Sequence, residues 1–211
     1  MRLAEVLFGD FRISAFRTLS FLLRRHRVIV GRGYSIKNAR NLILAPDSRL
    51  SLGIRPYGFA RGNDRGLLRL RGELRIDGHV TLATGCRIDV GPDASLAIGN
   101  GTYLSPYVRV IASLPMTIGE RCAIGWDVQL LDNDFHEFTG TPAAVARPSK
   151  SPVKIGNDVW IGSHARLYKG VEIADGCVIA GSAVVTRSFT TPGVLIAGNP
   201  ARVVRTNVRW S

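Results

Sequence analysis

Residues 155–185 carry a six-residue repeat: Ile155-Gly-Asn-Asp-Val-Trp160, Ile161-Gly-Ser-His-Ala-Arg166, Leu167-Tyr-Lys-Gly-Val-Glu172, Ile173-Ala-Asp-Gly-Cys-Val178, Ile179-Ala-Gly-Ser-Ala-Val184 and Val185. A large aliphatic residue begins each unit. A period of six matches neither the α-helix nor a simple strand, and hexapeptide repeats are typical of parallel β-helices. The repeat therefore predicts short strands joined by tight turns, with three strands in each triangular coil.

A second position of the repeat supports this interpretation. Four residues after each large aliphatic residue stands a smaller residue, namely Val159, Ala165, Val171, Cys177 and Ala183. We expect both positions to point inward and to stack on neighbouring coils about 4.8 Å away. Glycine and small polar residues fill the predicted corners, where close backbone approach or positive φ is needed.

The same pattern extends toward the N-terminus, with a slip near Gly91-Pro92 and two loops. It includes Leu70, Ile76, Leu82, Ile88, Ile98, Leu104, Val110, Ile118, Ile124 and Leu130. Residues 53–66 predict a loop that bulges from a corner, and residues 131–152 predict an inserted loop, whose length points to a functional role. We assign residues 28–190 to an all-β parallel β-helix and residues 191–211 to a short C-terminal tail.

Residues 1–27 lie outside the repeat and show partial helical spacing of apolar residues. We interpret them as a helical cap on the open end of the β-helix, which otherwise exposes strand edges. The alternative is an interfacial helix that contacts anionic membrane, since Arg24, Arg25, His26 and Arg27 follow it.

Composition narrows the possible partners and compartments. The net charge is +12, yet no basic run interleaved with aromatic residues or nucleic-acid motif occurs, so we expect no nucleic-acid partner.

The three cysteines occupy inward positions, as small buried residues of a reducing compartment; they are Cys86, Cys122 and Cys177. No Cys/His spacing predicts a metal site. Because no membrane span or signal peptide is evident, we expect a cytoplasmic protein, located there freely or at the inner face of the membrane.

Four segments within residues 118–205 resemble the hexapeptide-repeat acyltransferases, in the branch of galactoside, maltose and polysaccharide O-acetyltransferases. The segments are Ile155-Gly-Asn-Asp-Val-Trp-Ile-Gly-Ser-His, Gly170-Val-Glu-Ile-Ala-Asp-Gly, Val184-Val-Thr-Arg and Ala197-Gly-Asn-Pro-Ala-Arg-Val-Val-Arg. The resemblance implies a left-handed β-helix, a homotrimer, and acetyl-coenzyme A as donor substrate without a required metal.

Acetyl transfer from a thioester to a hydroxyl requires a base, oxyanion stabilisation and positioning of two substrates. The family's catalytic histidine lies in the inserted loop, so the resemblance assigns this role to His136. The other histidines, His26, His79 and His164, lie outside that loop. Either Asp134 or Asp132 would orient the imidazole, or cap the loop instead.

The resemblance also implies a donor groove between two subunits. It places the thioester carbonyl near the N–H of Ser163, beside Trp160 and Gly162, and the pantetheine arm near Gly181, Ser182 and Thr186. Arg187 with Arg202 or Arg205 would meet the phosphates, since guanidinium groups suit phosphate. Arg166 and Lys169 are expected at the surface.

One position departs from the galactoside branch. Ser105-Pro106-Tyr107 stands where those enzymes carry an asparagine that contacts the acceptor.

The sequence favours an O-acetyltransferase that acts on a sugar hydroxyl of a surface polysaccharide or its precursor. The alternatives are N-acetylation of an amino sugar or sugar nucleotide, and a non-catalytic β-helix scaffold.

Overall fold

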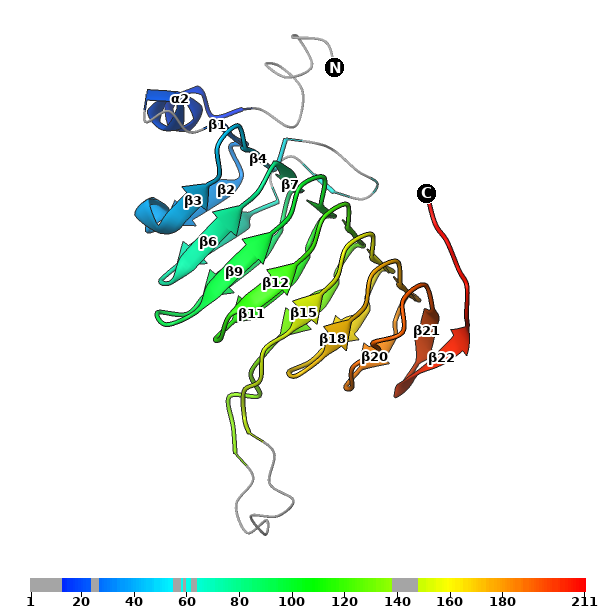
Figure 1. Cartoon of the computed structure of the whole chain (residues 1–211). Helices are drawn as coiled ribbons and strands as arrows, with labels where there is room; N and C mark the ends of the chain where they lie inside the picture. The colour runs from blue at the N-terminus through cyan, green and yellow to red at the C-terminus, as the bar shows by residue number, and fades with distance from the viewer. Residues whose placement is uncertain (1–12, 24–26, 55–57, 59, 62–63, 138–147) are drawn as a thin grey trace.

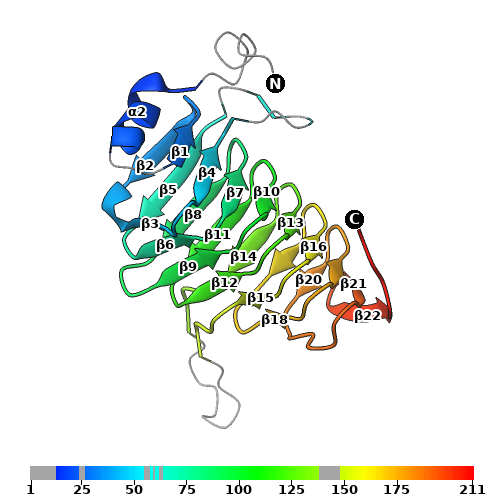
Figure 2. The same ribbon diagram turned by 45° about the horizontal axis from the view of Figure 1, so that its top comes forward.

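The computed structural model describes residues 13–23, 27–54, 58, 60–61, 64–137 and 148–211. Successive strands pass from one parallel sheet to the next, so the chain winds into a triangular β-helix (Figure 1). The loop between β14 and β15 leaves the side of this prism (Figures 1 and 2).

The first sheet contains β1 (Arg27–Val30), β4 (Arg49–Leu52), β7 (His79–Leu82), β10 (Tyr103–Leu104), β13 (Ala123–Ile124), β16 (Trp160–Ile161), β19 (Val178–Ile179), β21 (Leu195–Gly198) and β22 (Ala201–Arg205). The second contains β2 (Tyr34–Lys37), β5 (Gly66–Leu70), β8 (Arg87–Val90), β11 (Arg109–Ala112), β14 (Gln129–Leu131), β17 (Arg166–Leu167) and β20 (Val184–Val185). The third contains β3 (Leu42–Leu44), β6 (Glu73–Ile76), β9 (Ser95–Ile98), β12 (Met116–Ile118), β15 (Lys154–Ile155) and β18 (Glu172–Ile173).

The chain turns at the corners between sheets. We call the turn from the first sheet to the second the first corner, with residues 162–165 as an example, and the turn from the second sheet to the third the second corner, with residues 168–171. The loop at 131–152 interrupts a second corner.

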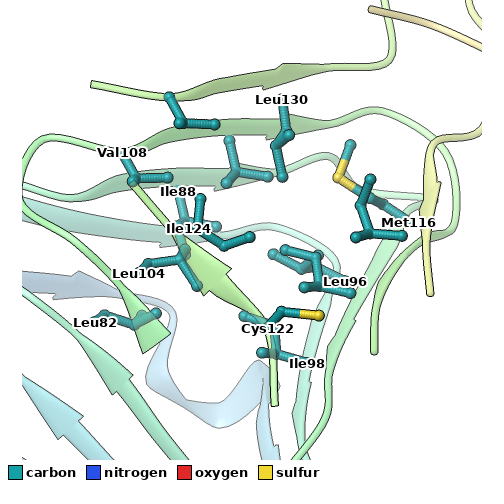
Figure 3. Packing of buried hydrophobic residues seen from close by; sticks show 14 of the residues in the cluster. Leu82, Ile88, Leu96, Ile98, Leu104, Val108, Met116, Cys122, Ile124 and Leu130 are labelled. Atoms are coloured by element: carbon teal, nitrogen blue, oxygen red, sulfur yellow. The ribbon is translucent and has the colours of Figure 1, made fainter. Parts of the chain in front are cut away.

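The six-residue register is confirmed in the stack. Ile161 pairs with Ile124 and Ile179, and Ile155 pairs with Ile173, so like residues lie above one another. These side chains are buried in one continuous core. Figure 3 shows another part of this core, with Leu82, Ile124 and Leu130 among its residues. The three cysteines are free and buried there, and burial raises the pKa of the Cys86 thiol to about 12.

At the N-terminal end, helix α2 (Ala15–Leu23) lies over the first coil (Figure 1). Phe21 is buried, and the Thr18 hydroxyl accepts a 3.1 Å hydrogen bond from the Val30 N–H. The helical cap is thus confirmed for the described part. Residues 1–12 and 24–26 of the predicted cap lie outside the described residues.

At the C-terminal end the β-helix continues past residue 190, where the sequence interpretation ended it. Phe189 forms a parallel bridge with Ile173, and β21 pairs with β19 so that Ile196 stacks on Ile179. The spacing of these apolar residues departs from six, which hid the last coil. The chain then reverses into β22, which is antiparallel to β21.

Candidate active site

The inserted loop leaves β14 as a short antiparallel ribbon. The Asp134 N–H donates to the Ser149 carbonyl at 2.8 Å, and the Ser151 N–H donates to the Asp132 carbonyl at 3.0 Å. A bridge between Asn133 and Lys150 lies between these bonds. The ribbon fixes the base of the loop, whereas residues 138–147 lie outside the described residues.

Asp132 anchors this ribbon to the preceding coil. Its carboxylate is fully buried and accepts hydrogen bonds from the N–H groups of Ser113, at 2.8 and 2.9 Å, and Leu114, at 2.8 Å. Desolvation raises the pKa of this carboxyl, and the backbone donors oppose that shift. Asp132 therefore caps the base of the loop.

Lys169 clamps the two arms of the loop. Its ammonium pairs with the Asp134 carboxylate on the outgoing arm and donates to the Pro148 carbonyl on the returning arm at 2.7 Å. The lysine side chain is only 18% exposed. Lys169 was expected at the surface, and the structure has it partly buried in the wall of an open pocket. Asp134 pairs with Lys169, and no hydrogen bond joins it to His136 within the described structure.

His136 lies two residues beyond the clamp and is exposed. Below the loop base is an open pocket of about 490 Å³, lined by residues that include Asp134, Tyr168, Lys169, Thr186 and Arg187. The Arg187 guanidinium lies 5.2 Å from the Phe189 ring centre. Two of the predicted donor residues, Thr186 and Arg187, thus lie at the base of the loop that carries His136.

Four other predicted donor residues, Gly162, Ser163, Gly181 and Ser182, lie at the first corner. The Ser182 N–H donates to the Ser163 carbonyl at 2.9 Å, which stacks the two turns. A Cβ at Gly162 would lie 2.5 Å from the Gly181 nitrogen, so this approach requires glycine. Within the described structure, the N–H groups of Ser163 and Gly181 form no backbone hydrogen bond.

His164 stands at the same corner, with a φ of 63° and its N–H bonded to the Trp126 carbonyl at 2.7 Å. Its side chain is exposed. His136 and His164 therefore occupy different corners of the prism.

Trp160 projects outward from β16 and is 45% exposed. Sequence reasoning missed the neighbour of this ring. The ring centre of Trp210 lies 6.3 Å away, and a 2.6 Å hydrogen bond from its Nε1 to the Asp158 carbonyl holds it there. Arg202 and Arg205 are exposed on β22, at the end of the same sheet. The predicted donor residues thus fall into three groups.

A second pocket, of about 510 Å³, opens on the first sheet above Trp160. It is lined by Gly58, His79, Thr81, Ala83, Gly101, Thr102, Tyr103, Leu104, Ser105 and Trp126. Tyr103, Ala123 and Trp160 are successive cross-strand partners, so the pocket and Trp160 share one face. Ser105 also lines this pocket, and it belongs to the segment where the sequence departs from the galactoside branch. Sequence reasoning missed this pocket because its walls come from separate coils.

Of the loop predicted at residues 53–66, which starts at a first corner, residues 55–57, 59 and 62–63 lie outside the described residues, and Gly58 lines one side of this pocket. Tyr107 donates from its hydroxyl to the Asp64 carboxylate, which lowers the pKa of Asp64 and raises that of Tyr107 to about 12. The Thr84 hydroxyl donates to the Asp64 carbonyl at 3.1 Å. Gly58 lies against the Trp126 ring, where a Cβ would clash.

Comparisons with known proteins agree with this architecture. A family model described as bacterial transferase hexapeptide (six repeats) matches residues 152–187. A Klebsiella pneumoniae protein, named an uncharacterized 24.8 kDa protein in the cps region, is 33% identical over 196 residues, which cover 92% of this chain and 86% of that one.

Galactoside O-acetyltransferase of Escherichia coli (strain K12) is 32% identical over 117 residues. That match covers 53% of this chain and spans only about half of that enzyme's length, 54%. The crystal structure of the polySia-specific acetyltransferase NeuO superposes with a TM-score of 0.54 at 20% identity, over 88% of this chain and 85% of that chain. At this identity, the likeness supports the left-handed parallel β-helix fold alone. The repeat, the fold and the nearly full-length relative together show that the chain belongs to the bacterial hexapeptide-repeat transferase family.

Proposed function

We propose that this chain transfers an acetyl group from acetyl-coenzyme A to a sugar hydroxyl of a surface polysaccharide or its precursor. The observation that carries the proposal is the placement of His136 on a loop whose base is fixed by Asp132 and Lys169. Histidine is the side chain that most often serves as a general base in enzymes. The exposure of His136 leaves the imidazole accessible to a substrate.

In the proposed step, the acceptor oxygen attacks the thioester carbonyl carbon while His136 takes the hydroxyl proton. The Ser163 N–H stabilises the developing oxyanion, as preorganised donors do in acyl transfer. The C–S bond then breaks, and the imidazolium returns its proton to the departing coenzyme A thiolate. No covalent acetyl-enzyme is needed, since the thioester is already reactive.

We place the acceptor in the pocket on the first sheet. Tyr103 and Trp126 offer aromatic surface, and His79, Thr81 and Ser105 offer polar groups, which is a composition suited to a sugar. The shared face with Trp160 supports this placement, because two strand spacings separate Tyr103 from Trp160, about 10 Å.

The donor would follow the first corner past Ser163 and Gly181. Its phosphates would meet Arg187 with Arg202 or Arg205. Free buried cysteines suit a reducing compartment, so we propose a cytoplasmic location.

We further propose a homotrimer in which each site takes residues from two chains. In one chain, His136 belongs to the second corner and Ser163 to the first, at opposite ends of a second-sheet strand. A cyclic trimer can bring the loop of one chain to the first corner of its neighbour.

Mixing two inactive variants tests this arrangement. We expect His136→Asn and Gly181→Leu to be inactive alone, the first without a base and the second with a filled donor corner. When the two chains are coexpressed, mixed trimers should regain activity, because some sites combine an intact loop with an intact corner. Labelled acetyl-coenzyme A and mass spectrometry of the acceptor provide the readout.

Three results would contradict these proposals. If mixed trimers stay as inactive as the parents, the base and the donor corner belong to one chain. Acetylated amines in place of esters would favour N-acetylation. Absence of both transfer and coenzyme A binding in the unaltered protein would favour the scaffold.

A separate prediction concerns the loop clamp. Replacing Lys169 with Met keeps the length of the side chain but removes the contacts to Asp134 and Pro148. We expect kcat to fall about tenfold, since small misplacements of catalytic groups cost rate, while donor affinity changes little. Kinetics with the identified acceptor measure this. Arg166→Met is the control, because Arg166 is exposed on β17 just before the second corner that holds Lys169. Equal losses of kcat in both variants would exclude a specific clamp.

A further inference from the structure

Helix α2 has two faces of different character. One face packs on the first coil through buried Phe21 and through Thr18. The other presents Phe16, Leu19 and Leu22, which are 84%, 55% and 52% exposed. These three residues follow one another at intervals of three, so they lie along one side of the helix. The cap therefore leaves an apolar stripe uncovered at the end of the prism.

Positive charge gathers at the same end of the molecule. The described residues between 13 and 52 include six lysine and arginine residues and one acidic residue, a net charge of +5 out of +12 for the chain. In the first two coils Arg32, Lys37, Arg40 and Arg49 are exposed. Within the described part of residues 13–52, the one ion pair joins Arg27 and Asp47, at 3.4 Å. Arg17 donates to the Tyr34 carbonyl, and the exposed cations of the two coils are in excess over the single described acidic residue.

We propose that this end of the prism docks on an anionic lipid bilayer. Phe16, Leu19 and Leu22 would enter the headgroup boundary, and the surrounding arginines would meet lipid phosphates. An apolar helix face flanked by basic residues binds membranes in this way, and each basic residue near an anionic surface adds to the attraction.

The helix has nine residues, and no helix in the described part of the chain is long and apolar enough to cross a bilayer. The contact is therefore peripheral. In the proposed trimer, three copies of the stripe would act together if the prism axes run alongside the threefold axis, which raises avidity without any new contact.

Vesicle flotation tests the docking. We expect the purified protein to float with vesicles that contain phosphatidylglycerol and to stay behind with pure phosphatidylcholine vesicles. The double variant Phe16→Ser, Leu19→Ser should bind the anionic vesicles about tenfold less or weaker still, because two large apolar side chains no longer leave water. Val203→Ser with Val204→Ser is the matched control, since these exposed residues lie on β22 at the other end and should leave binding unchanged.

Three outcomes would overturn the proposal. Unchanged flotation of the α2 double variant would show that any binding is electrostatic and does not use the stripe. Absence of flotation by the unaltered protein at low salt would exclude the membrane contact. Dissociation of the oligomer by the α2 variant, seen in sedimentation, would assign the stripe to a contact between chains. Because the stripe packs against nothing in the described structure, the variant should keep its melting temperature.

Discussion

Replacing His136 with Asn should lower kcat by about 10²- to 10⁴-fold, the usual contribution of a general base. Asparagine preserves approximate size and polarity but cannot take the acceptor proton. Donor affinity should change little, because the predicted donor contacts come from Ser163, Gly181 and the arginines. Single-turnover kinetics and a separate measurement of coenzyme A binding distinguish the two effects.

His164→Asn is the matched control for this prediction. His164 is exposed at the first corner with positive φ, a conformation that asparagine tolerates better than most residues. We expect nearly full turnover. Loss of activity in His164→Asn with donor binding intact, or near-full turnover in His136→Asn, would move the base away from the inserted loop.

His79 is less suitable as a control than its sequence position indicated. It lines the pocket that we assign to the acceptor. His79→Asn should therefore affect acceptor KM more than donor binding. Asp134→Asn should lower kcat less than His136→Asn does. The Asp134 carboxylate pairs with Lys169, so it affects His136 only by holding the loop in place.

Replacing Ile173 with Asp should abolish the native fold. Ile173 is 1% exposed and stacks on Ile155 in the third sheet. A carboxylate there would be buried without a partner, which costs several kcal/mol against a total stability of about 5–15 kcal/mol. We expect insoluble protein or loss of the cooperative thermal transition in calorimetry.

Glu172→Gln serves as the neighbouring control. Glu172 is exposed on the same strand, and its recorded hydrogen bonds use the backbone alone, so its change should leave the melting temperature nearly unaltered. A soluble Ile173→Asp protein with a native transition would contradict the inward register of the whole repeat.

The repeat was readable from the sequence because an inward position recurs with the same geometry at every step of the solenoid. The burial of Ile155, Ile161 and Ile173 could therefore be predicted without knowledge of distant contacts. The inserted loop was equally visible, since it breaks the phase between Leu130 and Ile155. The last coil escaped notice, because Phe189 and Ile196 fill it at irregular spacing.

The site was only partly readable. His136 was found through resemblance, as the histidine of the inserted loop. The role of Asp132 stayed open, because a sequence does not show that the N–H groups of Ser113 and Leu114 meet its carboxylate. The burial of Asp132 and these bonds show that it caps the base of the loop.

By itself, the sequence determined the β-helix, its stacking register and the place where the loop leaves it, because these follow from local periodicity. Only the tertiary structure decided which side chains meet across coils. Lys169 reaches Asp134 across 35 positions of sequence, and Trp210 reaches Asp158 across 52. Such contacts depend on how many residues each turn and loop consumes before the chain returns to the same face. A repeat pattern shows how many residues separate stacked positions only where the repeat is unbroken. The Lys169 clamp, the pair of Trp160 and Trp210, and the pocket on the first sheet all lie beside interruptions of the repeat or at its end.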